Sequence, residues 1–358
     1  MNTESLDSIQ TLTLKDIQEH LQHQGDYTIA ESLLTHPLNR IRKLAVSIKK
    51  ELVGRDKAVD AVLASFISRV PVVLFGPPGT AKSLLVRMIA DRTTDDPDHS
   101  SFFEYLMTMH TMPEELFGAI DVKKLLQENP EFQRATQGML PEKDFVFLDE
   151  IFRGGSHILN TLLTVVNEGK FHDGSKTIDV KAVGIVGAAN FPPNERELQA
   201  FYDRFPIRIW LDSLCSRGGS DAADTVEELL EKTLALRNPE PQAISCGNDF
   251  RFIQEFDKLY GLQSFEDADS DVTSEFLDAF RAAQGQPEFD LSDRSLGLFW
   301  RWSRAFDLLH EKDANMWGRR PENYLEVFRH MGSNPDGAKA AERFFQGRSS
   351  GSELGIHD

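Results

Sequence analysis

The chain has 358 residues and a formal net charge of −18, with 40% hydrophobic and 27% charged residues. This composition is typical of a soluble globular protein with one large domain or two ordinary ones. The longest apolar run, VPVVLF, is too short to cross a bilayer, and the start MNTESLDSIQ lacks the basic region of a signal peptide. A cytoplasmic location is therefore expected. Two cysteines make no disulfide framework, and the histidines show no zinc-ligand spacing.

The negative charge is concentrated in one part of the sequence. Between Asp212 and Asp293 there are 19 Asp and Glu residues against 6 Lys and Arg, a net charge of −13. This region repels a phosphate backbone, whereas a non-specific DNA binder needs a cationic surface. Nucleic acid is therefore an unfavoured partner.

The chain order of the predicted elements indicates an α/β core between two helical parts. Residues 1–45 read as a helical extension with breaks near Gly25 and Pro37. Residues 46–212 alternate short apolar runs with helical stretches, which predicts a parallel sheet covered by helices. The strands are expected in PVVLF, FFEYL, FVFLDE, AVGIVGAAN and IRIW. Residues 213–345 are expected to form a second, mostly helical domain, and 346–358 a disordered tail.

The stretch GPPGTAKS, residues 76–83, nearly fits the phosphate-loop pattern G-x-x-x-x-G-K-[ST]. A predicted strand precedes it and a predicted helix follows it. Its backbone N–H groups can wrap phosphates at a helix N-terminus, while Lys82 bridges the β- and γ-phosphates and Ser83 ligates Mg²⁺. ATP and Mg²⁺ are therefore the expected cofactors. The residues expected to contact the nucleotide are Val53, Gly54, Gly76, Pro77, Pro78, Gly79, Thr80, Ala81, Lys82, Ser83 and Leu84.

Ala81 stands where the phosphate-loop pattern has glycine. This residue lies where the loop enters the helix, so we expect its backbone to be right-handed already. In that conformation a methyl group costs little, unlike at a left-handed glycine position. The substitution is therefore expected to leave a working nucleotide site.

The run FVFLDE delivers two adjacent carboxylates at the carboxyl end of a strand, the edge where open α/β sheets bind ligands. We assign Asp149 to the metal and Glu150 to the general base that activates water. Alone this motif is weak, because apolar strands that end in acids are common. Together with the upstream phosphate loop it is a strong signal.

Two further polar residues lie next to predicted strands, Asn190 at the end of one and Arg204 just before another. Asn190 ends AVGIVGAAN and can orient the lytic water, although an Asn before FPPN also suits an ordinary turn. Arg204, just before the strand PIRIW, is either a surface partner of Asp203 or a finger that reaches a neighbouring subunit's nucleotide. Arg208 is the alternative finger.

The ordered set GPPGTAKS, FLDE, AAN and DRF, followed by SDRS before a long helix, resembles the MoxR branch of AAA+ ATPases. The runs FFEYLMTMHTMPEELFGAI, FVFLDEIFRGG, ILNTLLTVVNEGKF and FYDRFPIRIWLD are similar to RavA-type ATPases within it. The likeness covers roughly Leu52 to Phe345. It implies an AAA+ core whose five-stranded parallel sheet has the order 5-1-4-3-2, a helical lid and a hexameric ring.

The resemblance also implies roles for particular segments. Residues 121–141 match a hairpin that the helix-2-insert clade places in the second helix of the core, and residues 171–181 match the hairpin before the sensor strand. Arg204 matches the trans-acting arginine finger. Arg294 matches the second sensor on the lid; the alternative is a helix N-terminal residue paired with Asp293.

The resemblance implies an ATPase that converts ATP and water to ADP and phosphate and remodels a protein client, with a von Willebrand factor A domain protein as partner. The alternatives are a nucleic-acid motor that serves a nuclease and a nucleotide-bound assembly scaffold. The acidic balance disfavours the motor, and the intact Lys82, Asp149, Glu150 and Asn190 disfavour the scaffold. RavA-type proteins carry a further region after the lid, so we expect partner recognition here on the N-terminal helices or the acidic lid.

Overall fold

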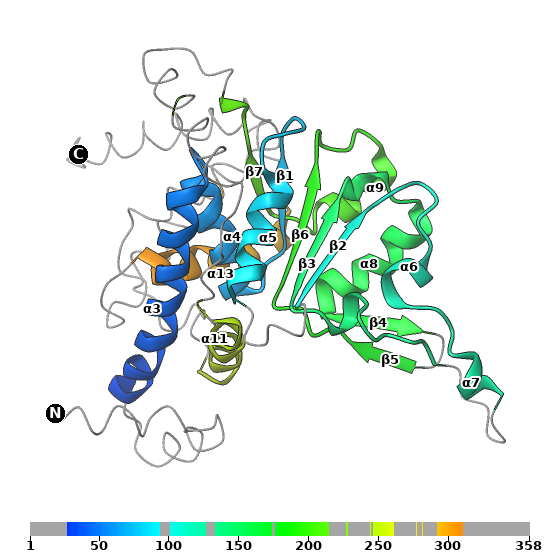
Figure 1. The fold of residues 1–358 in the computed structure, drawn as a ribbon, viewed down its shortest axis with the longest axis horizontal. Coiled ribbons are helices and arrows are strands. Elements are labelled where there is room, and N and C mark those ends of the chain that lie inside the picture. Colours follow the sequence, from blue (N-terminus) through cyan, green and yellow to red (C-terminus); the bar gives the residue numbers. More distant parts are fainter. Residues whose placement is uncertain are drawn as a thin grey trace, which may run out of the picture.

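The computed structural model describes residues 27–93, 101–126, 133–173, 176–214, 246–260 and 292–310, with residues 227, 244, 277 and 281. Nearly all of the expected helices at 225–236 and 271–283, and the whole tail at 346–358, lie outside these residues. In the part described, one sheet carries helices on both faces, and a small hairpin lies apart from it (Figure 1). No helix among the described residues is long and apolar enough to span a membrane.

The sheet has five parallel strands in the order β2-β3-β6-β1-β7. Counted along the chain as core strands one to five, this is the order 5-1-4-3-2 read from the other edge, so the predicted fold class is confirmed. The strands are β1 Val72–Phe75, β2 Phe102–Leu106, β3 Phe145–Asp149, β6 Gly184–Ala189 and β7 Ile207–Trp210. Each falls within an apolar run that the sequence marked as a strand.

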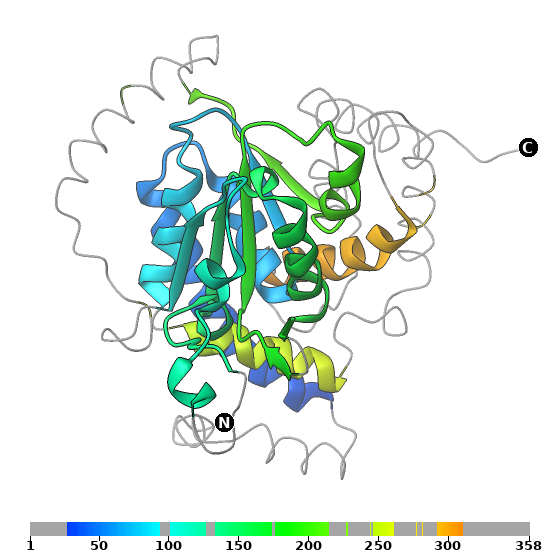
Figure 2. The same cartoon turned by 90° about the vertical axis from the view of Figure 1, so that its right-hand side faces the viewer.

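Alternate residues of the central strands enter two separate cores, as the period of two in a strand requires. Val72 and Leu74 of β1 pack into the core under α4 Asp56–Ser68 and α5 Lys82–Thr93. Val73 and Phe75 pack into the core under α8 Ser156–Glu168 and α9 Arg196–Tyr202. Figure 2 shows the sheet with the face that carries α8 and α9 toward the viewer. Because both faces are covered, all four residues of β1 are buried.

The N-terminal helix α3, Tyr27–Glu51, corrects one expectation. It runs unbroken through Pro37, where we had predicted a break, and it continues across residue 45, the end of the predicted N-terminal extension. An interior proline removes one helical hydrogen bond. The burial of an apolar stripe offsets that loss, because five side chains at helical spacing are fully buried: Leu34, Leu38, Ile41, Leu44 and Ile48.

Two described helices of the predicted lid pack on the same face as α3. They are α11 Gly247–Tyr260 and α13 Asp293–His310. Trp302 of α13 donates its indole N–H to the carbonyl of Ala61 at 3.2 Å and to the Ser65 hydroxyl at 3.0 Å, both in α4. The aromatic run of α13 is therefore core, because Phe299, Trp300 and Trp302 are all buried against the sheet's helical layer.

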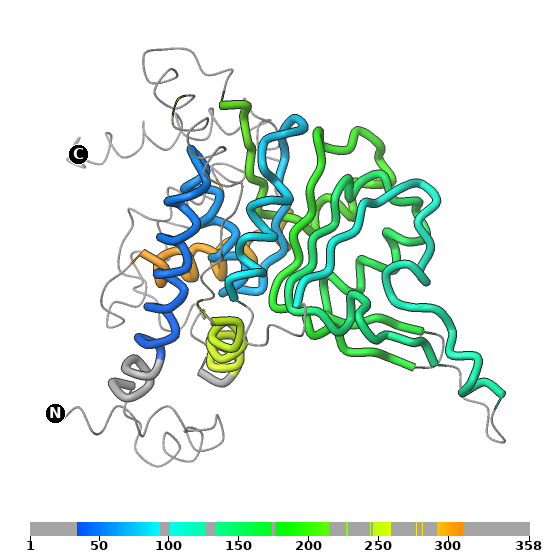
Figure 3. Tube along the Cα trace, viewed as in Figure 1, coloured from blue at the N-terminus to red at the C-terminus, as the bar shows by residue number. Residues whose placement is uncertain are grey.

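Two predicted hairpins leave the sheet on the opposite side. The strands β4 Lys170–Asp173 and β5 Lys176–Asp179 pair antiparallel immediately before β6, as expected. The predicted insert at 121–141 follows α6 Pro113–Phe117 and begins with α7 Val122–Leu125, and Ile120 and Arg134 pair across its base. The tube in Figure 3 shows α7 extending away from the body of the molecule. Short 3-10 turns at Leu140–Glu142 and Ile151–Arg153 complete the described elements.

Candidate functional site

The phosphate loop lies between β1 and α5, at the carboxyl edge of the sheet. Gly76 is required by space, because a Cβ atom there would lie 2.2 Å from the carbonyl oxygen of Leu211. The Thr80 hydroxyl donates to the carbonyl of Pro77 at 2.9 Å and closes the turn. Thr80 is buried, whereas Pro77, Pro78 and Gly79 are exposed. The loop therefore presents its backbone at an open edge.

The conformation predicted for Ala81 is wrong. Its φ is +67°, in the left-handed region, and Gly79 two residues earlier has φ +79°. Alternation of left- and right-handed residues turns successive N–H groups toward one side and forms an anion-binding nest. The loop keeps this alternation at a cost of about 1–2 kcal/mol for a non-glycine residue in the left-handed region. The glycine that the phosphate-loop pattern has at this position was the available sign of a left-handed residue.

The Lys82 side chain contacts the backbone of the phosphate loop. Its Nζ donates to the carbonyl oxygens of Gly76 at 2.6 Å and Pro77 at 3.1 Å, and lies 3.5 Å from Oδ1 of Asn190. Burial lowers the pKa of Lys82, while the nearby charges of Asp149 and Glu150 act in the opposite direction. The ammonium group therefore lies within the electrostatic reach of both carboxylates.

Asn190 and Glu150 are in direct contact although they lie 40 residues apart. The amide Nδ2 of Asn190 donates to Oε1 of Glu150 at 2.8 Å. Asn190 follows β6 and Glu150 follows β3, and these strands are neighbours in the sheet. The Asp149 carboxylate accepts the Glu150 backbone N–H at 2.9 Å, and Glu150 itself has φ +50°. The sheet thus brings Lys82, Asp149, Glu150 and Asn190 together.

Arg153 joins this cluster and was missed by the sequence analysis. Its Nε lies 3.4 Å from Oε2 of Glu150, so both oxygens of Glu150 are engaged. The Arg153 side chain is 69% exposed and that of Glu150 is 19% exposed. A cation three residues after an acid was the available signal, but it indicates contact only if the turn after the strand is helical. The 3-10 turn Ile151–Arg153 supplies that geometry.

The remaining predicted contact residues surround the loop. Val53 is buried, and a Cβ on Gly54 would lie 2.8 Å from the Leu214 side chain. Leu214 is three residues beyond Leu211, whose N–H donates to the Phe75 carbonyl at 2.8 Å. Ser83 is half-buried and Leu84 is 39% exposed in the first turn of α5.

Arg204 and Arg208 occupy different environments. Arg208 is buried in β7, with its guanidinium 3.9 Å from the centre of the Tyr202 ring and its Nε donating to the Phe205 carbonyl. Arg204 precedes the strand, and its buried Nε and Nη1 atoms have no hydrogen-bond partner in the described structure. Buried N–H groups of a guanidinium are normally hydrogen-bonded, and these two groups of Arg204 are not.

Arg294 lies near Asp203, the residue that precedes Arg204 in the sequence. Its Nη1 is 3.9 Å from Oδ2 of Asp203, and its side chain is 54% exposed. The pairing of Arg294 with Asp293 stays a prediction. Arg294 of α13 is thereby placed near Asp203 at the end of α9, the residue that precedes Arg204 in sequence.

The residues present fit a magnesium–nucleotide complex. The nest at residues 76–82 opens at the N-terminus of α5, a helix of 12 residues, where backbone dipoles favour anions. Within the described residues, no three His, Cys, Asp or Glu side chains gather to hold a metal on their own. Magnesium bound through one or two protein oxygens and substrate phosphates suits such a site, with Ser83 and Asp149 as the available ligands.

The sheet order, the phosphate loop and the acidic pair at the end of β3 define a P-loop nucleotide-binding fold of the AAA+ class. Residues 39–242, more than half of the chain, match the family described as the MoxR domain in the MoxR-vWA-beta-propeller ternary systems. The chain therefore belongs to the MoxR family of AAA+ ATPases.

Several known proteins are similar to this chain, at different levels of sequence identity. The uncharacterized protein MJ0079 of Methanocaldococcus jannaschii is 39% identical over 177 residues, 49% of this chain and 44% of that protein. Chaperone MoxR1 of Mycobacterium tuberculosis is 25% identical over 191 residues, 52% of this chain and 48% of that one. The chain spans about half or less of the length of such relatives. A candidate ATPase from Cytophaga hutchinsonii has the same fold, with a TM-score of 0.63 and 18% identity over 92% of this chain and 99% of that one.

Proposed function

We propose that this protein hydrolyses ATP to ADP and phosphate in a RavA-type hexameric ring and uses the energy to remodel a protein client. The observation that carries the proposal is the contact chain at the sheet edge. It runs from Lys82 to Asn190 at 3.5 Å and from Asn190 to Glu150 at 2.8 Å. The residue that meets the phosphates is thereby linked to the residue that activates water.

The chain's own groups divide the reaction between them. The nest of backbone N–H groups at residues 76–82 binds the β- and γ-phosphates, and Lys82 leaves the Gly76 and Pro77 carbonyls to join them. Glu150 takes a proton from the attacking water, and Asn190 orients that water. Ser83 and Asp149 would hold Mg²⁺, which would supply neutralisation of the charge that develops on the phosphates.

The second half of the site comes from the neighbouring subunit. We assign the trans-acting finger to Arg204 and not to Arg208, because Arg208 is buried beneath Tyr202. The Nε and Nη1 atoms of Arg204 have no partner in the described structure but are buried, so the finger must turn outward to meet a phosphate group of the neighbouring subunit. Since Arg294 lies 3.9 Å from Asp203, the second sensor acts at the same edge as the finger.

The partner follows from the family. Its description names systems that combine a MoxR domain with a von Willebrand factor A protein and a β-propeller protein. We therefore propose a von Willebrand factor A domain protein as the partner that couples turnover to the client. The insert at 121–141 and the hairpin β4–β5 are the parts of the chain that meet the client in the ring.

Two variants test the assignment of the site. Glu150→Gln keeps the phosphate contacts but lacks a base, so it is expected to bind ATP normally and to hydrolyse it at least 100-fold more slowly, in the range found for general bases. Lys82→Ala is expected to lose ATP binding itself. Equilibrium binding of a labelled ATP analogue and phosphate release separate the two effects. Hydrolysis by Glu150→Gln at the wild-type rate would refute the assignment of the base.

A further inference from the structure

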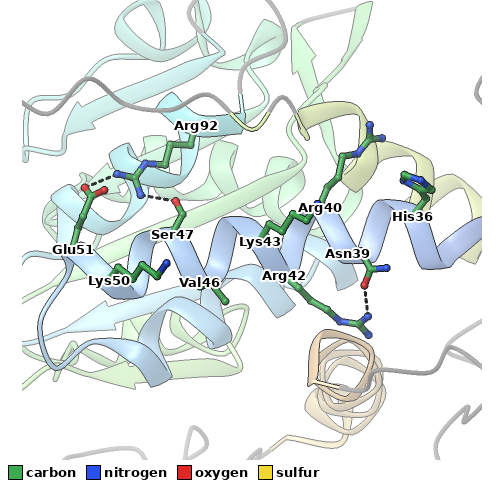
Figure 4. A pocket seen from close by; sticks show the side chains of 10 residues that line it. All are labelled: His36, Asn39, Arg40, Arg42, Lys43, Val46, Ser47, Lys50, Glu51 and Arg92. Carbon is green, nitrogen blue, oxygen red and sulfur yellow. Dashed lines mark hydrogen bonds and ion pairs between the residues drawn. The ribbon is translucent and has the colours of Figure 1, made fainter.

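A large groove lies along α3, on the helical side of the molecule and apart from the phosphate loop. It has a volume of about 980 Å³, and its lining comes from α3 together with Arg92 at the end of α5. Figure 4 shows its side chains arranged along one side of α3 from His36 to Glu51. We call this concave surface the basic groove.

The basic groove is strongly cationic in an acidic protein. Among the described residues that line it, Glu51 is the single carboxylate and five are Lys or Arg: Arg40, Arg42, Lys43, Lys50 and Arg92. The chain as a whole carries −18. An acidic ligand that is repelled elsewhere on this protein is therefore attracted here.

Most of the groove's arginines already have partners that fix them. Arg40 pairs with Asp249 of α11, Arg92 donates to Glu51 and to Ser47, and Arg42 donates to the carbonyls of Leu308 and Leu309. In contrast, Lys43 and Lys50 make no ion pair within the described structure. The arginines form a rigid wall, and the two lysines are available to a ligand.

The chemistry of the groove suits an acidic polypeptide better than a nucleic acid. Two available lysines are few, since duplex-binding proteins make roughly 6–10 phosphate contacts. Val46 lies among the charges and is 53% exposed, so the groove offers an apolar contact that a phosphate backbone does not use. The favoured ligand therefore combines carboxylates with an apolar side chain.

This chain contains a segment with that composition. Residues 264–275, SFEDADSDVTSE, hold five Asp or Glu residues, a phenylalanine and a valine, and no Lys or Arg. We propose that the basic groove binds residues 264–275 of a second copy of the chain. This inference rests on the proposed function because it assumes the proposed ring. To that ring it adds a specific contact between subunits.

Cross-linking of the full-length protein tests the contact directly. Copies labelled with ¹⁴N and ¹⁵N are mixed, allowed to exchange and treated with a carbodiimide that joins lysines to carboxylates. We expect peptides in which Lys43 or Lys50 of one isotope is joined to residues 264–275 of the other. Same-isotope cross-links alone would assign the segment to its own chain and overturn the proposal, and so would the absence of any cross-link.

Charge reversal provides a second measurement. The double variant Lys43→Glu and Lys50→Glu is expected to weaken self-association at least tenfold in sedimentation. Addition of Asp267→Lys and Asp269→Lys to that chain should restore it. A control with Arg87→Glu and Lys258→Glu, two exposed cations outside the groove, should associate like the wild type. Binding of single-stranded DNA that requires Lys43 and Lys50 would instead identify a nucleic-acid site and overturn the proposal.

Measurement of ATP hydrolysis separates this inference from the proposed function. A wild-type protein that turns over ATP but shows neither cross-link nor charge rescue would refute the groove contact alone. A protein that shows both but does not turn over ATP would refute the proposed activity alone.

Discussion

At the scale of single residues, the contacts of Glu150 bear on its proposed role as a general base. Its Oε1 accepts from Asn190 and its Oε2 faces Arg153, while its own backbone is left-handed. A carboxylate engaged on both oxygens is poorly placed to receive a proton from water. In the proposed mechanism Asn190 turns to the attacking water when ATP binds, and this movement releases one of the two restraints. Arg153 remains as the other.

Arg153→Ala is therefore expected to raise the rate of ATP turnover in the absence of a client. An exposed ion pair contributes up to about 1 kcal/mol, so kcat should rise by no more than about fivefold, with KM unchanged. Arg153→Lys keeps the charge and should retain the wild-type rate. Steady-state phosphate release across ATP concentrations measures both parameters, and a lower kcat for Arg153→Ala would contradict the restraint.

Ala81 gives a second residue-scale prediction, because its left-handed backbone is tolerated by alanine but not by a branched side chain. Ala81→Gly removes the strain, and the greater freedom of glycine in the unfolded chain offsets part of the gain. ATP affinity should therefore stay within about threefold of the wild type. Ala81→Val should weaken ATP binding more than tenfold, as the loop abandons the nest. Equal affinity for all three proteins would show that the nest does not extend to residue 81.

At the scale of elements, three helices meet at one carboxylate. Asp60 of α4 accepts from Lys49 of α3 at 2.6 Å and lies 3.1 Å from Nε2 of His310, at the end of α13. Burial disfavours the charged imidazole, but hydrogen bonds to Asp60 and to the Phe306 carbonyl, with the Asp60 charge, outweigh it and raise the pKa of His310. The contact between α13 and α4 therefore depends on pH.

The sign of this dependence follows from the raised pKa. The contribution of His310 to folding is fully present below its unfolded pKa of about 6.5 and is lost as the pH rises through the higher folded value. Chemical denaturation of wild type and His310→Gln should therefore show a larger difference in the free energy of unfolding at pH 6 than at pH 8. Equal differences at the two pH values would exclude this role.

At the scale of the whole molecule, the polar residues of the candidate site lie in two separate groups at two edges. Lys82, Glu150 and Asn190 gather at the phosphate loop, while Arg294 lies near Asp203, the residue that precedes Arg204. No described contact joins the two groups within one chain. In the head-to-tail ring that we propose, the edge of one copy meets the other edge of the next.

Mixing variants tests this division. Arg204→Ala and Lys82→Ala are each expected to be nearly inactive alone, since arginine fingers contribute roughly 10³–10⁵ in rate. In a random equal mixture, about one quarter of the head-to-tail interfaces regain both groups, so turnover should recover toward about a quarter of wild type. A mixture of Lys82→Ala with Glu150→Gln should show no recovery, because both residues act in the same site. No recovery in the first mixture, with co-assembly shown separately, would contradict the trans assignment.

The sequence by itself determined the elements and the position of the candidate site. Apolar periods mark strands and helices locally, and the carboxyl ends of parallel strands meet at one edge, so Lys82, Asp149, Glu150 and Asn190 could be brought together from their order alone. Only the tertiary structure decided which side chains touch. It placed Arg153 on Glu150, Arg294 on Asp203 and Arg208 inside the core, and it turned Ala81 left-handed. It also carried α3 through Pro37. Such features depend on packing between distant segments, which local pattern does not encode.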